Sequence, residues 1–183
     1  MTRDEALQLL HEFTQADSLR KHALAVEAGM RAYARQLGED EELWGVVGLL
    51  HDFDYERYPT LGEHPLKGAE VLRERGVAEE IVLGCLAHYP PSGVPHDTPL
   101  RRAIFAVDEL AGFIIAVALV RPSKQLADVE VKSVKKKLKD KAFAAAVSRE
   151  DIQQGADEMG VSLEEHIATV LEGMKAVAPT LGL

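Results

Sequence analysis

The sequence predicts an all-α fold, a single-domain helical bundle over residues 1–183, and three observations lead to that prediction. Apolar residues recur at three- and four-residue steps along most of the chain. Signals that start and stop helices separate these segments. We find no stretch with sustained alternation of apolar and polar residues, which a half-buried strand would show. At 183 residues, 46% of them hydrophobic, the chain is long enough to bury one substantial core.

Three helices are expected in the first quarter of the chain. The first spans about residues 2–14, because Thr2-Arg3-Asp4-Glu5 has the pattern of a capping box. The second runs from a cap at Asp17 or Ser18 to about Leu37 and stops at Gly38. The third starts near Asp40 and carries an apolar run into His51-Asp52.

In the middle of the chain, the sequence predicts two shorter helices and two loops. Residues 53–63 contain a proline and a glycine and are expected to form a loop. His64 is placed at the cap of a fourth helix that has Pro65 in its first turn and ends near Gly76. A fifth helix runs to His88 and stops before a proline-rich loop.

The remaining helices include the most apolar segment of the chain. Thr98-Pro99 opens a sixth helix that is apolar on almost all sides as far as Val120, so we expect it to be central. A lysine-rich helical segment follows at residues 132–141. Ser148 and Ser162 are expected to cap two closing helices.

Composition narrows the class of protein. The longest run without charge, Ala111–Val120, is too short to span a bilayer, and the acidic N-terminus is unlike a signal peptide. The single cysteine, Cys85, excludes an internal disulfide and favours a cytoplasmic location. The net charge of −9 argues against polymeric nucleic acid as a partner but permits a small anionic substrate in a metal-containing pocket. The oligomeric state stays open.

Four polar residues stand out because each lies on or at the end of an apolar helix: His22, His51, Asp52 and Asp108. Imidazole and carboxylate donors of this kind suit Mn, Fe, Co, Ni, Zn or Mg rather than a thiolate-type zinc site. Carboxylates brought together in a core would repel one another, and a divalent cation relieves that repulsion. The set therefore predicts a metal site, provided that three helices of one bundle bring the residues together.

Each of these residues also has a purely structural interpretation. His22 could be a packed histidine, and His51-Asp52 could be a polar last turn in which the histidine suits the helix dipole. Asp108 could form a buried salt bridge with Arg101. The order of the residues along the chain favours the metal site over these alternatives.

The order H…HD…D, with an isolated aspartate on a later apolar helix, resembles the HD-domain superfamily of metal-dependent phosphohydrolases. The segment GEHPLKGAEVL is similar to the one that follows the doublet in HDIG-type members. The resemblance covers about residues 18–122, the metal-site core, and the C-terminal helical extension of about residues 123–183 resembles the tail of small bacterial HD hydrolases.

The resemblance implies a ligand set and a reaction. His22, His51, Asp52 and Asp108 would hold one divalent metal ion, and His64 and His88 match the two extra histidines of binuclear members. The implied reaction is hydrolysis of a small phosphate ester by a metal-activated water, which Asp52 would also orient. Some superfamily members use the same six ligands for a di-iron oxygenase, and HD domains that have lost ligands act as non-catalytic metal or nucleotide sensors.

The chain departs from the family pattern directly after the doublet. HDIG members continue with Ile-Gly-Lys, whereas this chain continues with Phe-Asp-Tyr, so Tyr55 replaces the expected lysine. His64 and His88 could also be ordinary residues beside prolines. Arg121 and Lys124 could bind a substrate phosphate, and the lysine-rich segment could equally be a solvated helix face. His11 and His166 are expected at the surface, and His96-Asp97 is expected to serve a turn.

Overall fold

In the computed structural model, which describes residues 1–60 and 62–183, the chain folds into helices joined by loops. Across this described part there is no strand. The helices are α1 (Arg3–Phe13), α2 (Asp17–Leu37), α3 (Glu41–Leu50), α4 (Leu66–Glu74), α5 (Glu79–Leu86), α6 (Pro99–Leu119), α7 (Val131–Leu138), α8 (Arg149–Glu158), α9 (Leu163–Ala176) and α10 (Ala178–Leu181), with short 3-10 segments η1 (Pro90–Ser92) and η2 (Leu126–Asp128).

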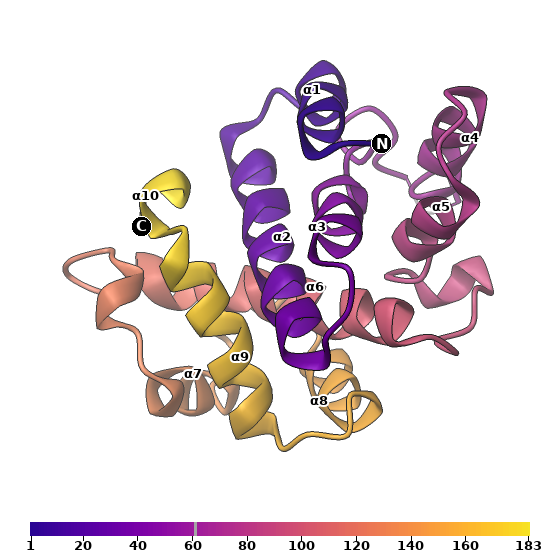
Figure 1. Cartoon of the computed structure of the whole chain (residues 1–183). Helices are drawn as coiled ribbons and strands as arrows, with labels where there is room; N and C mark the ends of the chain where they lie inside the picture. Colours follow the sequence, from indigo (N-terminus) through magenta and orange to yellow (C-terminus); the bar gives the residue numbers. More distant parts are fainter. Residues whose placement is uncertain (61) are drawn as a thin grey trace.

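The centre of the fold is made by α2, α3 and α6. Helices α2 and α3 lie side by side, and α6 crosses behind their lower parts (Figure 1). Gly48 in α3 allows the close approach, because a Cβ atom there would come within 2.8 Å of the Glu27 Cα atom in α2. The middle of α6 is buried from Ala103 to Val107, as its apolar sequence predicts. This packing brings positions in α2, in α6 and at the end of α3 close together.

The outer helices cover this centre from different sides. Helix α9 packs along α2, and α7 and α8 pack against α6 (Figure 1). Helices α4 and α5 pack against each other, and α5 contacts α3. Among the described residues, no helix is both long enough and apolar enough to cross a membrane.

Most of the predicted helix boundaries are confirmed by their caps. Thr2 and Glu5 form the expected capping box, and Ser162 forms a second one with Glu165. The side chain of Asp40 accepts from two backbone N–H groups at the start of α3. Gly38 ends α2 with a φ of 73°, a left-handed conformation that glycine adopts without a steric cost.

Three boundary predictions need correction, and one short helix was not predicted. Pro65, not His64, is the cap residue of α4, so His64 lies in the loop before it. Ala16 caps α2 without a side-chain hydrogen bond, so neither Asp17 nor Ser18 does. The lysine-rich helix ends at Leu138, three residues early, and α10 was not predicted. The predicted loop 53–63 is confirmed apart from position 61, which lies outside the described residues.

Candidate metal centre

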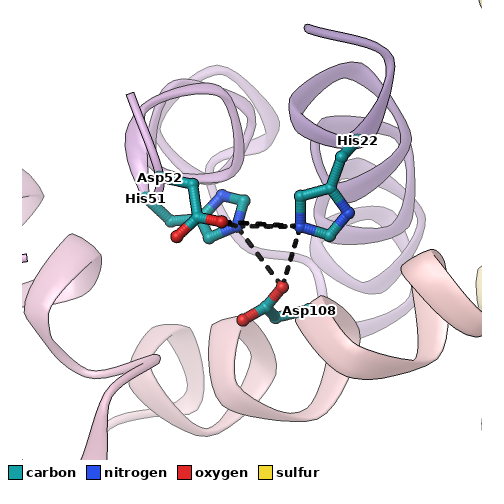
Figure 2. Close-up of side chains that lie close together, drawn as sticks. All are labelled: His22, His51, Asp52 and Asp108. Carbon is teal, nitrogen blue, oxygen red and sulfur yellow. Dashed lines mark hydrogen bonds and ion pairs between the residues drawn. The ribbon is translucent and has the colours of Figure 1, made fainter. Parts of the chain in front are cut away.

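The three central helices bring His22, His51, Asp52 and Asp108 together (Figure 2). His22 comes from α2, Asp108 from the middle of α6, and the doublet directly follows the end of α3. The Oδ1 atom of Asp108 lies 2.9 Å from His22 Nε2 and 3.4 Å from His51 Nε2. The two imidazole Nε2 atoms are 3.3 Å apart. We call these four residues the first donor group.

Asp52 also belongs to a second donor group, which it forms with His64 and His88. Its Oδ1 atom lies 3.0 Å from His64 Nε2 and 3.2 Å from His88 Nε2. Its other oxygen, Oδ2, faces the first group, 3.5 Å from His51 Nε2. Asp52 therefore lies between the two groups and offers one carboxylate oxygen to each.

Three of the four histidines are anchored through the nitrogen that faces away from the cluster. His51 Nδ1 donates to the Gly48 carbonyl oxygen at 2.8 Å, and His88 Nδ1 donates to the Cys85 carbonyl oxygen at 2.6 Å. His64 Nδ1 donates to Asp54 Oδ1 at 2.8 Å. Because these acceptors fix the proton on Nδ1, the Nε2 lone pair of each neutral ring points into the cluster, as metal-ligating histidines require.

Asp54 is the buried carboxylate that orients His64. It is fully buried, and its second oxygen accepts from the Gly68 backbone N–H at 2.8 Å. Glycine is required at position 68 because a Cβ atom there would lie 2.6 Å from the Asp54 Cγ atom. The Phe-Asp-Tyr departure thus supplies an outer partner for the cluster through its central aspartate.

The donor set fits a divalent cation. Without a positive charge, Nε2 lone pairs would face one another at 3.2–3.3 Å beside two carboxylates, an arrangement that is repulsive in a partly buried site. Imidazole nitrogen and carboxylate oxygen are the donors that borderline and hard divalent ions prefer. The described His and Asp side chains are therefore positioned to hold a metal ion, whose identity the donor set leaves open among Mn, Fe, Co, Ni, Zn and Mg.

When no cation is present, protons take its place. Burial opposes a charge on His51, but the charges of Asp52 and Asp108 outweigh burial and raise its pKa to about 9. For His64, burial is likewise outweighed by its hydrogen bonds to Asp52 and Asp54, and the pKa rises to about 9. The pKa values of both Asp52 and Asp108 are lowered by the neighbouring histidines, despite burial. The cluster therefore stabilises positive charge at its centre.

Glu109 and Glu63, the sequence neighbours of Asp108 and His64, make hydrogen bonds outside the cluster. Glu109 accepts from the Ser148 backbone N–H at 3.2 Å, and burial followed by the charge of Asp108 raises its pKa to about 7. Glu63 accepts from the Thr60 hydroxyl. The Tyr55 ring packs edge-on against His64, with centroids 5.2 Å apart, and 41% of the residue is exposed. Tyr55 therefore forms part of the rim where HDIG members carry lysine.

The structure does not bring Arg121 and Lys124 to the cluster. Both follow the end of α6 at Leu119, which a helical rise of about 1.5 Å per residue puts roughly 16 Å from Asp108. Arg121 donates to the Ser133 hydroxyl, and Lys124 is exposed. Arg101 pairs with Asp97, not with Asp108.

The three histidines outside the cluster differ in environment. His11 is exposed as predicted. The prediction of a surface position is wrong for His166, which is fully buried because α9 packs it against Tyr33 and α6. His96 lies in the expected loop but is hydrogen-bonded to Glu158 and to the Ala87 carbonyl oxygen, contacts that turn chemistry alone does not explain. His96 belongs to the second His-Asp doublet of the sequence, His96-Asp97, which marked this position.

Sequence comparisons identify relatives of this chain. It is 29% identical to Ribonuclease Y of Nitratidesulfovibrio vulgaris (strain DP4) over 109 residues, which are 57% of this chain and 20% of the relative. It is 31% identical over 109 residues to Ribonuclease Y of Lawsonia intracellularis (strain PHE/MN1-00), with the same coverage. The match thus spans about a fifth of the length of these curated relatives.

The family model for the HD domain matches residues 19–112, just over half of the 183 residues. This interval contains all six residues of the two donor groups. HD-domain proteins are in general metal-dependent phosphohydrolases, and the all-α architecture agrees with that fold. The chain belongs to the HD domain family.

Proposed function

We propose that this protein is a metal-dependent hydrolase of a small phosphate ester, with two divalent ions held by the two donor groups. The observation that carries the proposal is the position of Asp52, whose two oxygens face different sets of imidazole nitrogens. A carboxylate shared in this way is typical of sites that hold two ions about 3.5–4 Å apart.

Each residue has a distinct task in this proposal. His22, His51 and Asp108 hold one ion, His64 and His88 hold the other, and Asp52 serves both. The outward hydrogen bonds of His51, His64 and His88 keep the Nδ1 protons in place, so that the Nε2 atoms stay free to bind. Bound divalent ions would polarise a phosphoryl oxygen and lower the pKa of a water to about 7. Asp52 would also orient that water.

The substrate class follows from charge and from the relatives. A chain with a net charge of −9 favours a small phosphomonoester or phosphodiester over a long nucleic acid, because polymeric phosphate requires a basic surface. The curated relatives are named ribonucleases, so a short RNA belongs among the substrates to be tested. Tyr55, exposed beside His64, would contact the organic part of a bound ester.

The test combines metal analysis with a substrate panel. Purified protein is analysed for metal content, stripped with a chelator, reloaded separately with Mn²⁺, Co²⁺, Fe²⁺, Zn²⁺ or Mg²⁺, and assayed on nucleoside monophosphates, cyclic nucleotides, other phosphodiesters and a short RNA. We expect phosphate ester hydrolysis that depends on the added ion. Asp97→Ala is the matched control, because it removes the exposed aspartate of the other His-Asp doublet.

Two results would contradict the proposed hydrolase and favour another function. Oxygen uptake by the iron-loaded protein, with no hydrolysis in any metal, would favour the di-iron oxygenase that the same six ligands permit. Metal or nucleotide binding without turnover of any substrate would favour a sensor.

A further inference from the structure

His96 joins three segments that are distant in the sequence. Its Nδ1 atom lies 2.6 Å from Glu158 Oε2 in the last turn of α8, and its Nε2 atom lies 2.9 Å from the Ala87 carbonyl oxygen just after α5. The ring packs against Phe105 of α6, with centroids 4.6 Å apart. We call the chain of contacts from Glu158 through His96 to Ala87 the His96 tie.

The chemistry of the partners makes this tie a strong one. A backbone carbonyl and a carboxylate both accept hydrogen bonds, so the ring that satisfies both donates from both nitrogens. Hydrogen bonds to a carboxylate are about twice as strong as those between neutral groups. Both side chains are mostly shielded, at 15% and 24% exposure, which limits screening by solvent.

The position of Glu158 is set by close packing between α8 and α6. Gly155 lies against α6, since a Cβ atom there would come within 2.5 Å of the Ala106 Cα atom. Glu158 follows three residues later, on the side of the helix that faces the loop of His96. Gln154 holds the other oxygen of Glu158 at 2.7 Å. Helix α8 therefore presents a fixed carboxylate to the loop.

The carbonyl at the other end of the tie belongs to the residue before His88. At the end of α5, three successive carbonyl groups accept from side chains of the following loop: Cys85 from His88, Leu86 from Ser92, and Ala87 from His96. These groups are the free acceptors that every helix leaves at its end. The tie thus fixes the backbone at the point where it presents His88 to the second donor group.

We propose that His96 and Glu158 are positioning residues for the second ion, through which α8, outside the matched HD interval, holds His88 in its binding orientation. This inference rests on the proposed function in so far as the second donor group binds a metal. Among the described residues, the tie shares no hydrogen bond with His22, His51 or Asp108, so we expect the larger effect on the ion of the second group.

The test is a calorimetric titration of the chelator-treated full chain with Mn²⁺. The variants Glu158→Ala and His96→Ala break the tie, and Glu158→Gln keeps an acceptor oxygen for the His96 N–H. Asp157→Ala is the matched control, because it removes an exposed carboxylate from the neighbouring position of α8. His88→Ala identifies which of the two binding events belongs to the second group.

We expect Glu158→Ala and His96→Ala to weaken that event about tenfold, the lower end of the range for outer partners of metal ligands. The other event stays unchanged, Glu158→Gln recovers most of the affinity, and Asp157→Ala matches the wild type. Hydrogen exchange of the amides of residues 87–89 in the metal-free protein should speed up in Glu158→Ala but not in Asp157→Ala.

Two Mn²⁺ affinities equal to the wild-type values in folded Glu158→Ala would overturn this inference while leaving the proposed function intact. If that variant does not fold, His96→Gln replaces the imidazole with a side chain of similar length and is judged by the same criterion. A wild type that binds none of Mn²⁺, Co²⁺, Fe²⁺, Zn²⁺ and Mg²⁺ would overturn the proposed function, and the positioning of a second ion with it.

Discussion

The two donor groups that share Asp52 are built on different kinds of backbone. In the first group, His22 and Asp108 lie within α2 and α6, two helices of 21 residues that pack in the centre of the fold. In the second group, His64 and His88 lie in loops, one before α4 and the other after α5. Core packing therefore positions the first group, whereas the second depends on hydrogen bonds.

This difference predicts how each donor group responds to substitutions outside it. The ligands of the first group are fixed by apolar neighbours along whole helices, so single substitutions outside the group should have little effect on them. The second group relies on Asp54, which holds His64, and on the Cys85 carbonyl oxygen, which holds His88. Side chains that bind no metal themselves should therefore control the second ion more than the first.

The largest effect is expected from Asp52→Ala, because this substitution removes the residue that both groups share. We expect the loss of both ions and a fall in activity of more than ~100-fold, which exceeds the range for outer partners. Elemental analysis and the phosphate ester assay measure the two effects. Asp97→Ala, from the neighbouring doublet, should leave both unchanged. Retention of two ions by Asp52→Ala would end the idea of a shared ligand.

Substitutions within one donor group should remove only the ion of that group. Asp108→Ala should remove the ion of the first group only, and His88→Ala the ion of the second only, so each variant keeps one ion instead of two. Native mass spectrometry of the folded proteins counts the bound ions directly. If Asp108→Ala and His88→Ala each lost both ions, the two groups would form one inseparable site and the comparison would fail.

Asp54→Asn tests the dependence of the second group on its outer partner. The aspartate accepts from both His64 Nδ1–H and the Gly68 N–H, whereas an asparagine has a single acceptor oxygen, so one donor is left unsatisfied. We expect affinity for the second ion to fall about 10- to 100-fold and the free energy of unfolding to fall by about 1–3 kcal/mol. Calorimetric metal titration and urea unfolding provide the measurements.

A matched control for this substitution is Glu70→Ala, which removes an exposed acid from α4 that pairs with Lys67. It should leave both ions and the stability close to wild type, because exposed ion pairs contribute little. An Asp54→Asn protein with an unchanged second affinity would show that His64 is held by its own loop rather than by the carboxylate.

The sequence predicted the first group better than the second, and the reason is physical. Asp108 stands out because a carboxylate in the apolar segment of α6 needs a partner, and His51-Asp52 stands out at the end of another apolar run. The apolar sequence of α6 also predicts that this helix is central, and the burial of most of its residues confirms this. Local patterns were sufficient here because the ligands lie on long, regular helices.

The parts that were missed depend on contacts between distant segments. No local pattern shows that Glu158 would meet His96 across 62 positions, or that α9 would bury His166 against Tyr33. The sequence left open a phosphate contact from Arg121, but the length of α6 separates this residue from Asp108. Sequence spacing gives the position of a residue along a helix, whereas the partner across the core follows from tertiary packing.

His166 sharpens the comparison, because it shows a buried imidazole that has no carboxylate beside it. Its Nε2–H donates to the Ala106 carbonyl oxygen and its Nδ1 accepts from the Tyr33 hydroxyl, so the neutral ring is satisfied. Burial lowers its pKa to about 4. His51 is equally buried, yet Asp52 and Asp108 raise its pKa to about 9. The charge next to the ring, rather than its burial, decides the direction of the shift.

The stability of the fold should reflect the lowered pKa of His166. Between about pH 6.5 and pH 4 the unfolded chain binds a proton at this residue and the folded protein does not, so stability falls as the pH falls through this window. The contribution of this histidine to the loss should reach about 2–3 kcal/mol at pH 4.5 and vanish above pH 7. Urea unfolding of the metal-free wild type and of His166→Gln, at pH 7.5 and pH 4.5, isolates the contribution of His166, because the other titrating groups are common to both proteins.

The wild type should lose more stability than the His166→Gln variant between the two pH values. Equal losses would mean that His166 binds a proton in the folded state, and that burial without a neighbouring carboxylate does not keep an imidazole neutral in this core.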